Sequence, residues 1–181
     1  MVIANGNTII LRDWIQDDFV LYKNWHDSKF EWTKLNGPYY PLKSAEELDQ
    51  EIQLLKVNSK TKKRFVIANK ATNTLIGTVS WYWQSEETNW ISIGLAIFDE
   101  HYWGKGIGYE ALSLWVDYLF SIFSEIVRLD LRTWSGNTGM IKLSEKLGFQ
   151  KEATFRKARI VNGNYYDSLA YGVLREEWKN V

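Results

Sequence analysis

A glycine-rich turn between a β-type segment and a helical segment constrains the fold of this chain most. Residues 90–98 are rich in β-branched and aromatic side chains and predict a strand, and apolar residues at helical spacing after Gly108 predict a long helix. The turn between them reads Trp103-Gly104-Lys105-Gly106-Ile107-Gly108. Glycines let the backbone approach phosphate oxygens, while the free N–H groups of the first helical turn point at them. The turn is therefore either an anion site suited to a diphosphate or only a sharp reversal of the chain.

Two other phosphate-binding motifs do not fit these glycines. A Walker loop needs a Gly, four intervening positions and then Gly-Lys followed directly by Ser or Thr, and here Gly104-Lys105 is followed by Gly106. A dinucleotide fingerprint needs a parallel βαβ unit near the N-terminus and an acidic residue about twenty positions later. Neither pattern is met.

The same periodicities place the other elements and predict one α/β domain with a mixed sheet over residues 1–181. Ser44 and Glu47 form a capping box for a helix that ends near Asn58, and Asn162-Gly163 suits a two-residue hairpin turn. The expected order is a strand at 8–11, helices at 16–25 and 44–58, strands at 65–68, 75–83 and 90–98, a helix from 108, a strand at 127–133, a helix at 137–147 ended by Gly148, and two strands flanking 162–163.

Composition narrows the classes of function. The 22 basic and 22 acidic side chains show no run of like charge, so a nonspecific nucleic-acid binder is not expected. The chain has no cysteine and two histidines, which argues against a metal site. No secretory signal or bilayer-spanning stretch stands out, so we expect a cytoplasmic protein without a membrane partner. Ten Trp and ten Tyr leave aromatic surface for a pocket or for self-association, such as a homodimer.

Three runs of residues resemble the two central motifs of the GNAT superfamily. They are Ile93–Phe98, Tyr102–Leu112 and Asn137–Phe149. The ending, with Phe155-Arg156, Asn162-Gly163-Asn164-Tyr165-Tyr166-Asp167 and Glu177-Trp178, resembles the RimJ/RimL-type branch, whose characterised members acetylate protein N-terminal α-amines. The resemblance covers nearly the whole chain. It implies splayed central strands with flanking helices, and acyl-CoA in the V-shaped gap between the strands.

The activity implied by this resemblance is direct transfer of an acetyl group from acetyl-CoA to a primary amine. A protein or peptide N-terminal α-amine is one expected acceptor, and an aminoglycoside or a polyamine-like small molecule is the alternative. A noncatalytic acyl-CoA-binding module is a further alternative, because a shared fold does not guarantee activity.

The resemblance also implies a set of cofactor-binding residues. The backbone of Ala96, Ile97 and Phe98 is expected to bind the pantetheine arm, with an N–H near Phe98 polarising the thioester carbonyl. Asn137 either contacts the cofactor or only caps the following helix. The full expected set is Ala96, Ile97, Phe98, Trp103, Gly104, Lys105, Gly106, Ile107, Gly108, Tyr109 and Asn137.

The catalytic groups depart from the family pattern at two positions. Ser144 stands where many relatives place a Tyr that protonates the leaving thiolate, so it is either that donor or a hydroxyl bonded back to its own helix. Ser92 stands where relatives often have a Glu base, which leaves a water chain or the carboxylate of Glu31 or Asp167. Aromatic faces attract ammonium groups, although packing is the other role open to each ring. The expected acceptor-binding residues are Glu31, Trp32, Trp81, Trp83, Tyr166 and Asp167.

Overall fold

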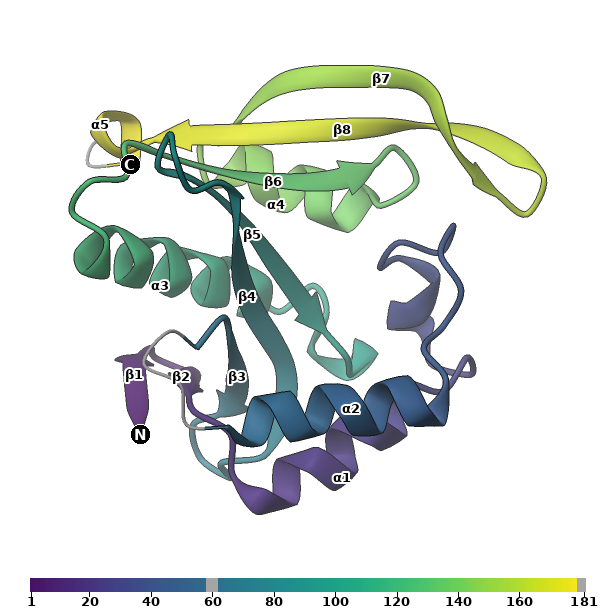
Figure 1. Ribbon diagram of the computed structural model, residues 1–181, viewed down its shortest axis with the longest axis vertical. Coiled ribbons are helices and arrows are strands. Elements are labelled where there is room, and N and C mark those ends of the chain that lie inside the picture. The colour runs from purple at the N-terminus through teal and green to yellow at the C-terminus, as the bar shows by residue number, and fades with distance from the viewer. Residues whose placement is uncertain (58–61, 179–181) are drawn as a thin grey trace.

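One mixed sheet organises the part of the chain that the structure, a computed structural model, describes, namely residues 1–57 and 62–178 (Figure 1). Its eight strands lie in the order β1-β2-β3-β4-β5-β6-β8-β7, and every neighbouring pair is antiparallel except β5 and β6. The strands are β1 Val2–Asn5, β2 Ile9–Arg12, β3 Arg64–Asn69, β4 Leu75–Ser85, β5 Trp90–Ile97, β6 Arg128–Trp134, β7 Gln150–Val161 and β8 Asn164–Leu174.

Helices cover both faces of the sheet. The buried side chains of β3 alternate between the two faces and therefore pack into two different apolar clusters. Phe65 and Ile67 pack with α3, whereas Val66 and Ala68 pack with α1 and α2. Figure 1 shows α1 and α2 lying together, with α3 beside the central strands. The helices are α1 Gln16–Trp25, α2 Ala45–Lys56, α3 Ile107–Ile122, α4 Thr138–Lys146 and α5 Arg175–Trp178, with short 3₁₀ helices η1 Glu31–Lys34 and η2 Glu100–Tyr102.

The local signals in the sequence act as expected where they are strongest. Ser44 Oγ accepts from the N–H of Glu47, and the carboxylate of Glu47 accepts from the N–H of Ser44 at 2.7 Å, which confirms the capping box. Asn162 and Gly163 take positive φ angles of 49° and 77° and join β7 to β8, which confirms the hairpin turn. Helix α2 ends at Lys56, and Asn58 lies outside the described residues.

The structure also contains elements that the sequence did not predict. These are β1, the two 3₁₀ helices and α5, all four residues long or shorter. Such short segments carry too few residues for a periodic pattern to emerge. The mixed α/β class and its central hairpins are confirmed. No helix among the described residues is long and apolar enough to cross a bilayer.

The feature of the sheet that creates a site is the short contact between β5 and β6. Only Ile91 with Leu129 and Ser92 with Asp130 are paired, whereas β5 pairs with β4 over almost its full length. Beyond Ser92 the two parallel strands separate, and the edge of β5 that faces β6 has no strand partner. The gap that the family resemblance implied is therefore present (Figure 1).

A buried ion pair fixes α1 against the sheet and thereby one wall of the site. Arg12 on β2 and Asp18 on α1 bond through both guanidinium nitrogens, at 2.6 and 2.9 Å, and both side chains are almost fully buried. Arg12 also donates to Asn73, and Asp18 accepts from the N–H of Ile15. Removing one partner from such a pair leaves an uncompensated buried charge.

We expect Asp18→Asn to lower the free energy of unfolding by about 3 kcal/mol, because Arg12 loses its counter-ion. Urea denaturation followed by tryptophan fluorescence measures this change. Asp17→Asn is the matched control, because Asp17 is the exposed neighbour on the same helix and should change stability by less than about 0.5 kcal/mol. Equal stability of the two variants would contradict the structural role of the pair.

Candidate active site

The open edge of β5 offers backbone groups to a ligand. Phe98 donates its N–H to the carbonyl of Ile76 on β4 at 2.9 Å. Backbone groups alternate direction along an antiparallel pair, so with the printed register the N–H groups of Leu95 and Ile97 point away from β4 into the gap. An extended amide chain laid along this edge would meet unpaired backbone donors and acceptors, as a further strand would.

This geometry corrects the expected roles of Ala96 and Phe98. Their backbone groups belong to the ladder with β4, and the Phe98 side chain is buried with Tyr22 and Trp32 on the α1 side of the sheet. The N–H of Phe98 is therefore not free to polarise a carbonyl. Position alone did not show which strand edge each amide faces, because that depends on the register with β4.

The glycine turn has the backbone conformation of an anion site. Gly104 and Gly106 have φ angles of 71° and 82°, a region that other residues rarely adopt, and no atom lies within 4 Å of where a Cβ would stand on either. Gly106 caps α3, whose first N–H groups are free because they precede the first intrahelical bond. The indole N–H of Trp103 holds the turn to β5 by donating to the Ile97 carbonyl at 3.1 Å.

A cleft of about 420 Å³ connects this turn to the open edge of β5 and to α4. Eight of the expected cofactor residues line it: Ala96, Ile97, Trp103, Gly104, Gly106, Gly108, Tyr109 and Asn137. Lys142 and Lys146, one turn apart on α4, also line it and place two cations there. Sequence reasoning missed both lysines, although their i, i+4 spacing in the expected helix was a usable signal.

Besides Phe98, two expected cofactor residues are not among the residues that line the cleft. The Ile107 side chain is buried in the core with α3, and the Lys105 side chain is exposed on the turn. Only the backbone of these two residues is left for the predicted role. Their contact with a phosphate stays a prediction.

Asn137 and the segment after η1 form one wall of the cleft. Asn137 caps α4 by accepting from the N–H of Met140 at 3.0 Å, which is the capping role that the sequence offered as one alternative. Its amide also donates to the carbonyl of Leu35, which the Trp134 indole reaches as well, at 2.8 Å. The loop after η1 is thereby tied to the end of β6 and forms a roof over the gap.

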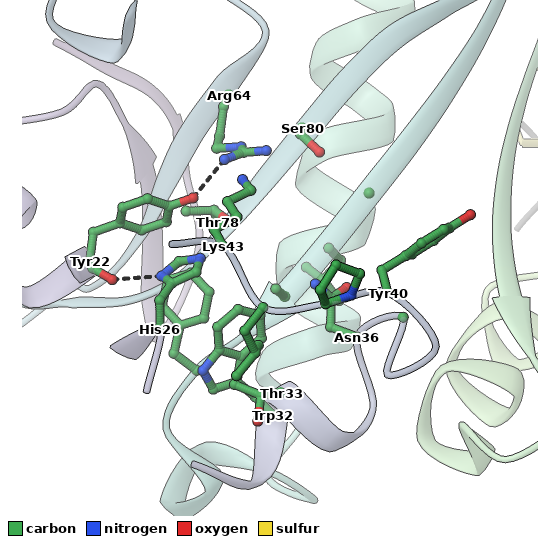
Figure 2. A pocket seen from close by; sticks show the side chains of 17 residues that line it. Tyr22, His26, Trp32, Thr33, Asn36, Tyr40, Lys43, Arg64, Thr78 and Ser80 are labelled. Atoms are coloured by element: carbon green, nitrogen blue, oxygen red, sulfur yellow. Dashed lines mark hydrogen bonds between the residues drawn. The ribbon is translucent and has the colours of Figure 1, made fainter. Parts of the chain in front are cut away.

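A second cavity of about 300 Å³ lies on the α1 side of β5. Trp32, Asn36, Leu95 and Ala96 line both this cavity and the cleft, so the two spaces meet at one point of β5. Figure 2 shows the side chains of the second cavity, with Arg64, Lys43 and Ser80 toward one end and Tyr40 at the other. We refer to it as the acceptor cavity.

Charged groups occupy one end of the acceptor cavity. Glu51 on α2 bonds Arg64 and Lys43, the latter at 2.6 Å, and it accepts from the Tyr22 hydroxyl at 3.1 Å. Burial acts to raise the pKa of Glu51, but Arg64 and Lys43 outweigh it and lower that pKa, so Glu51 is ionised. Burial raises the pKa of Tyr22, which stays protonated and accepts from Arg64 at 2.7 Å.

His26 is the neutral base that lines the acceptor cavity. Its Nδ1 lies 2.7 Å from the carbonyl of Tyr22, and because a carbonyl only accepts, Nδ1 carries the proton and Nε2 keeps a lone pair. Burial lowers the pKa of His26, and Lys43 and Arg64 lower it further. The rings of Tyr22 and Trp32 lie 4.3 and 5.0 Å from the imidazole and fix its plane. No partner for His26 could be predicted from its position in the sequence.

The structure corrects most of the expected acceptor-binding residues, although Trp32 does line both cavities. Trp81 and Trp83 pack against Phe123 on the opposite face of the sheet, because in this part of β4 the side chains on the register of Val79 point toward α3. Neither lines the acceptor cavity. Alternation along a strand assigns residues to two faces, but the sequence did not say which face held the site.

Three more expected acceptor residues lie outside both cavities. Glu31 is half-exposed and pairs with Lys34 on η1. Tyr166 packs edge-on against Trp134, with 4.9 Å between ring centroids. Asp167 accepts from the N–H of Lys157 at 2.8 Å within the β7–β8 hairpin. None of the three lines either cavity, and their expected roles in binding or as the base stay predictions.

The two serines of the catalytic region are both fully buried. Ser144 donates to the Met140 carbonyl at 2.8 Å and lines neither cavity, which is the helix-bonded alternative. Its role as proton donor stays a prediction, which an unchanged turnover number in Ser144→Ala would exclude. Ser92 donates to Asp130 on β6, a carboxylate whose pKa burial raises. The contact of Asp130 with Ser92 could not be predicted from the sequence, because it follows from the parallel pairing of β5 and β6 alone.

No cluster of three or more His, Cys, Asp or Glu suited to a metal ion occurs in the described ranges.

Residues 8–150 match the family described as acetyltransferase (GNAT) domain. The chain belongs to the GNAT acetyltransferase family.

Curated relatives agree with this membership. The chain is 30% identical over 142 residues to a protein named uncharacterized N-acetyltransferase YoaA of Bacillus subtilis (strain 168), covering 76% of this chain and 79% of that one. It is 29% identical over 164 residues to the N-acetyltransferase p20 of Bacillus licheniformis, covering 91% and 90%.

Solved structures share the fold at lower identity. The spermidine N-acetyltransferase of Vibrio cholerae, in complex with CoA and spermine, has a TM-score of 0.79 at 19% identity, over 96% of this chain and 99% of that one. The ribosomal-protein alpha-N-acetyltransferase RimL, in complex with CoA, has a TM-score of 0.77 at 21% identity, over 96% and 98%.

Family membership confirms three predictions made from the sequence. The fold is the mixed α/β fold of the GNAT acyltransferases, the chain is an N-acetyltransferase enzyme, and acetyl-CoA is its acyl donor. The residues fit that donor, since the cleft offers two open glycines, the free amides of α3 and two lysines to phosphate groups.

We expect Gly106→Ala to raise the Kd for acetyl-CoA by about 10-fold, because an alanine at a φ of 82° costs roughly 1–2 kcal/mol and tilts the cap of α3. Isothermal titration calorimetry measures this constant. Gly163→Ala is the matched control, with a φ of 77° and equally open surroundings at the hairpin turn. It should lose similar stability and keep the wild-type Kd, and equal weakening in both variants would disprove a local role of Gly106.

Proposed function

We propose that the chain transfers the acetyl group of acetyl-CoA directly to a primary amine held in the acceptor cavity. The observation that carries this proposal is the meeting of the two cavities at Trp32, Asn36, Leu95 and Ala96. A thioester in the cleft and an amine in the acceptor cavity would approach each other at this point of β5. Direct transfer needs such contact and no covalent enzyme intermediate.

The residues around the meeting point supply the chemistry that acyl transfer needs. Acetyl-CoA, when bound, supplies the acetyl group as a thioester. The N–H groups of Leu95 and Ile97 face the gap and stabilise negative charge on the carbonyl oxygen. Nε2 of His26 accepts a proton from the acceptor's nitrogen, so that the neutral amine can attack the thioester carbonyl. Ser144 is the donor we propose for the leaving thiolate, once its hydroxyl turns from Met140.

The pyrophosphate and the pantetheine arm have separate partners in this proposal. The free amides of residues 106–109 and the amines of Lys142 and Lys146 would bind phosphate oxygens. Lys146 already lies over the ring of Tyr109, 5.0 Å from its centroid, which holds its charge beside the α3 N-terminus. Asn137 lines the same cleft, so it can contact the cofactor in addition to capping α4.

We also propose that the chain falls in the RimJ/RimL-type branch, from the residues of its last hairpin and their order in the sequence. The long β7–β8 hairpin, which extends past the neighbouring strands in Figure 1, carries that signature. The branch includes enzymes for protein α-amines, so peptides belong among the acceptors to be tested.

We expect acetyl-CoA to bind the protein with a micromolar Kd and to release CoA thiol when a suitable primary amine is added. Calorimetry measures the first, and a thiol-reactive chromophore measures the second across peptides, polyamines, aminoglycosides, amino acids and aminoalkyl phosphates. Mass spectrometry of the product should show one added acetyl group. Failure of both CoA and acetyl-CoA to bind the folded protein would disprove the proposal, and binding without thiol release would reduce the chain to an acyl-CoA-binding module.

We expect His26→Gln to lower kcat/KM by about 10²-fold or more, because the proton acceptor is lost. Burial lowers the pKa of His26 from its usual range, so wild-type kcat/KM should show an acidic limb where the pH falls through that lowered pKa, in addition to the dependence set by the amine. The variant should lack this limb while both proteins keep the rise at high pH that the amine itself causes.

His101→Gln is the control for this pH profile. His101 is largely exposed, lies beside Asp99 and lines neither cavity. Its replacement should leave kcat/KM and its pH dependence unchanged. An acidic limb that survives in His26→Gln would assign the proton acceptor to another group.

A further inference from the structure

The charges of the acceptor cavity have the opposite sign to those expected around a polycationic substrate. Lys43 and Arg64 line the cavity, and no Asp or Glu is among its described lining residues. A carboxylate is the strongest protein partner for the ammonium of a diamine or polyamine that is not acetylated. Here its second ammonium would face two cations, which costs free energy rather than supplying it.

Glu51 does not neutralise the positive charge of Lys43 and Arg64, because one carboxylate pairs with two cations. It bonds Nη1 of Arg64 and Nζ of Lys43, and the cluster with Tyr22 keeps a net charge of about +1 by formal count. The contact also has a geometric effect. By bonding both cations from α2, Glu51 restrains the two side chains, which lie close together in Figure 2.

Arg64 keeps donors that nothing else in the described chain uses. Its two hydrogen bonds, to Tyr22 and Glu51, both leave from Nη1. Nη2 and Nε have no acceptor among the described residues, and they are not among the buried atoms without a partner, so solvent in the cavity reaches them. A planar pair of free guanidinium donors matches the two oxygens of a carboxylate or phosphate.

The register of the sheet sets the distance between this group and the reaction centre. Arg64 on β3 is directly opposite Ser80 on β4, which is opposite Gly94 on β5. Neighbouring strands lie about 4.8 Å apart, so Arg64 starts roughly 10 Å from β5 at the backbone. The Ser80 hydroxyl lies in line between them and offers a further donor, and Gly94 leaves the path open because a Cβ there would meet Ser80 Oγ at 2.8 Å.

We propose that the acceptor carries an oxyanion group, a carboxylate or a phosphate, within a few bonds of its amine, and that Arg64 and Lys43 bind that group. This inference rests on the proposed transfer to an amine and specifies its substrate class as small amino acids or aminoalkyl phosphates. The oxyanion lies at the Arg64 end, and the amine lies at Leu95 and Ala96, where the cavity meets the cleft. A cavity of about 300 Å³ suits a molecule of this size.

Matched acceptors test the inference with the intact wild-type enzyme and acetyl-CoA. The pairs differ only in the anion: ω-amino carboxylates against their amides, α-amino acids against their amides, and phosphoethanolamine against ethanolamine. We expect the anionic member of at least one pair to have a kcat/KM about 10- to 100-fold higher, the range for hydrogen bonds to a charged group. Which pair responds distinguishes a carboxylate from a phosphate.

Variants assign the preference to the two cations. Lys43→Gln and Arg64→Lys should reduce the ratio of anionic to neutral kcat/KM by about 10-fold while the KM for acetyl-CoA stays unchanged. Lys43 is half-exposed, so its replacement keeps the fold even if Arg64→Lys weakens the contact with Glu51. Lys23→Gln is the matched control, because Lys23 also pairs with an α2 carboxylate, Asp49 at 2.7 Å, but lines neither cavity. It should keep the wild-type ratio.

The outcomes separate this inference from the activity on which it rests. If neutral amines or polyamines are acetylated as well as anionic ones, the inference is wrong and the proposed activity stands. An anion preference that persists in both Lys43→Gln and Arg64→Lys would also overturn it. If acetyl-CoA binds but no amine turns over, calorimetry with the CoA complex applies the same pairs to binding, and equal or absent binding of both members overturns the inference as well.

Discussion

The separation of β5 from β6 is the constraint on which the rest of this structure depends. Two parallel strands that pair at only two positions leave the N–H groups of Leu95 and Ile97 without a strand partner in the middle of a sheet. Unpaired backbone groups are costly when they are buried, so such an edge persists only if solvent or a ligand reaches it. The cleft beside β5 provides that access. The missing strand contacts are thus the reason why a peptide-like ligand can bind here.

Two arginines, each paired with a carboxylate on a helix, differ in how many of their nitrogens the protein itself uses. Arg12 uses both terminal nitrogens on Asp18 and its Nε on Asn73, so all its nitrogens are satisfied within the protein. Arg64 is held through Nη1 alone, by Glu51 and Tyr22. The first arrangement is a closed structural contact. The second holds the guanidinium in place while its other nitrogens stay free.

The sequence predicted what depends on local pattern, and it missed what depends on register. The capping box at Ser44, the turn at Gly163 and the glycines at 104 and 106 act through their own backbone, so they could be predicted. Trp81 was assigned to the wrong face, and Phe98 to the wrong edge, because both depend on pairing between β4 and β5. Arg64, Lys43 and His26 come together from β3, from the segment before α2 and from the end of α1. No spacing along the chain connects these three, so the charged end of the cavity could not be predicted from a single sequence.

The roof over the gap has a thermodynamic consequence for how the two ligands affect each other. The same loop supplies Trp32 and Asn36 to both cavities, and its Leu35 carbonyl is tied to the end of β6 by Trp134 and Asn137. The two cavities therefore share a wall. Any coupling between their ligands through this wall must be reciprocal, so that each ligand changes the affinity for the other by the same factor. Such coupling would run through a loop that neither strand contains.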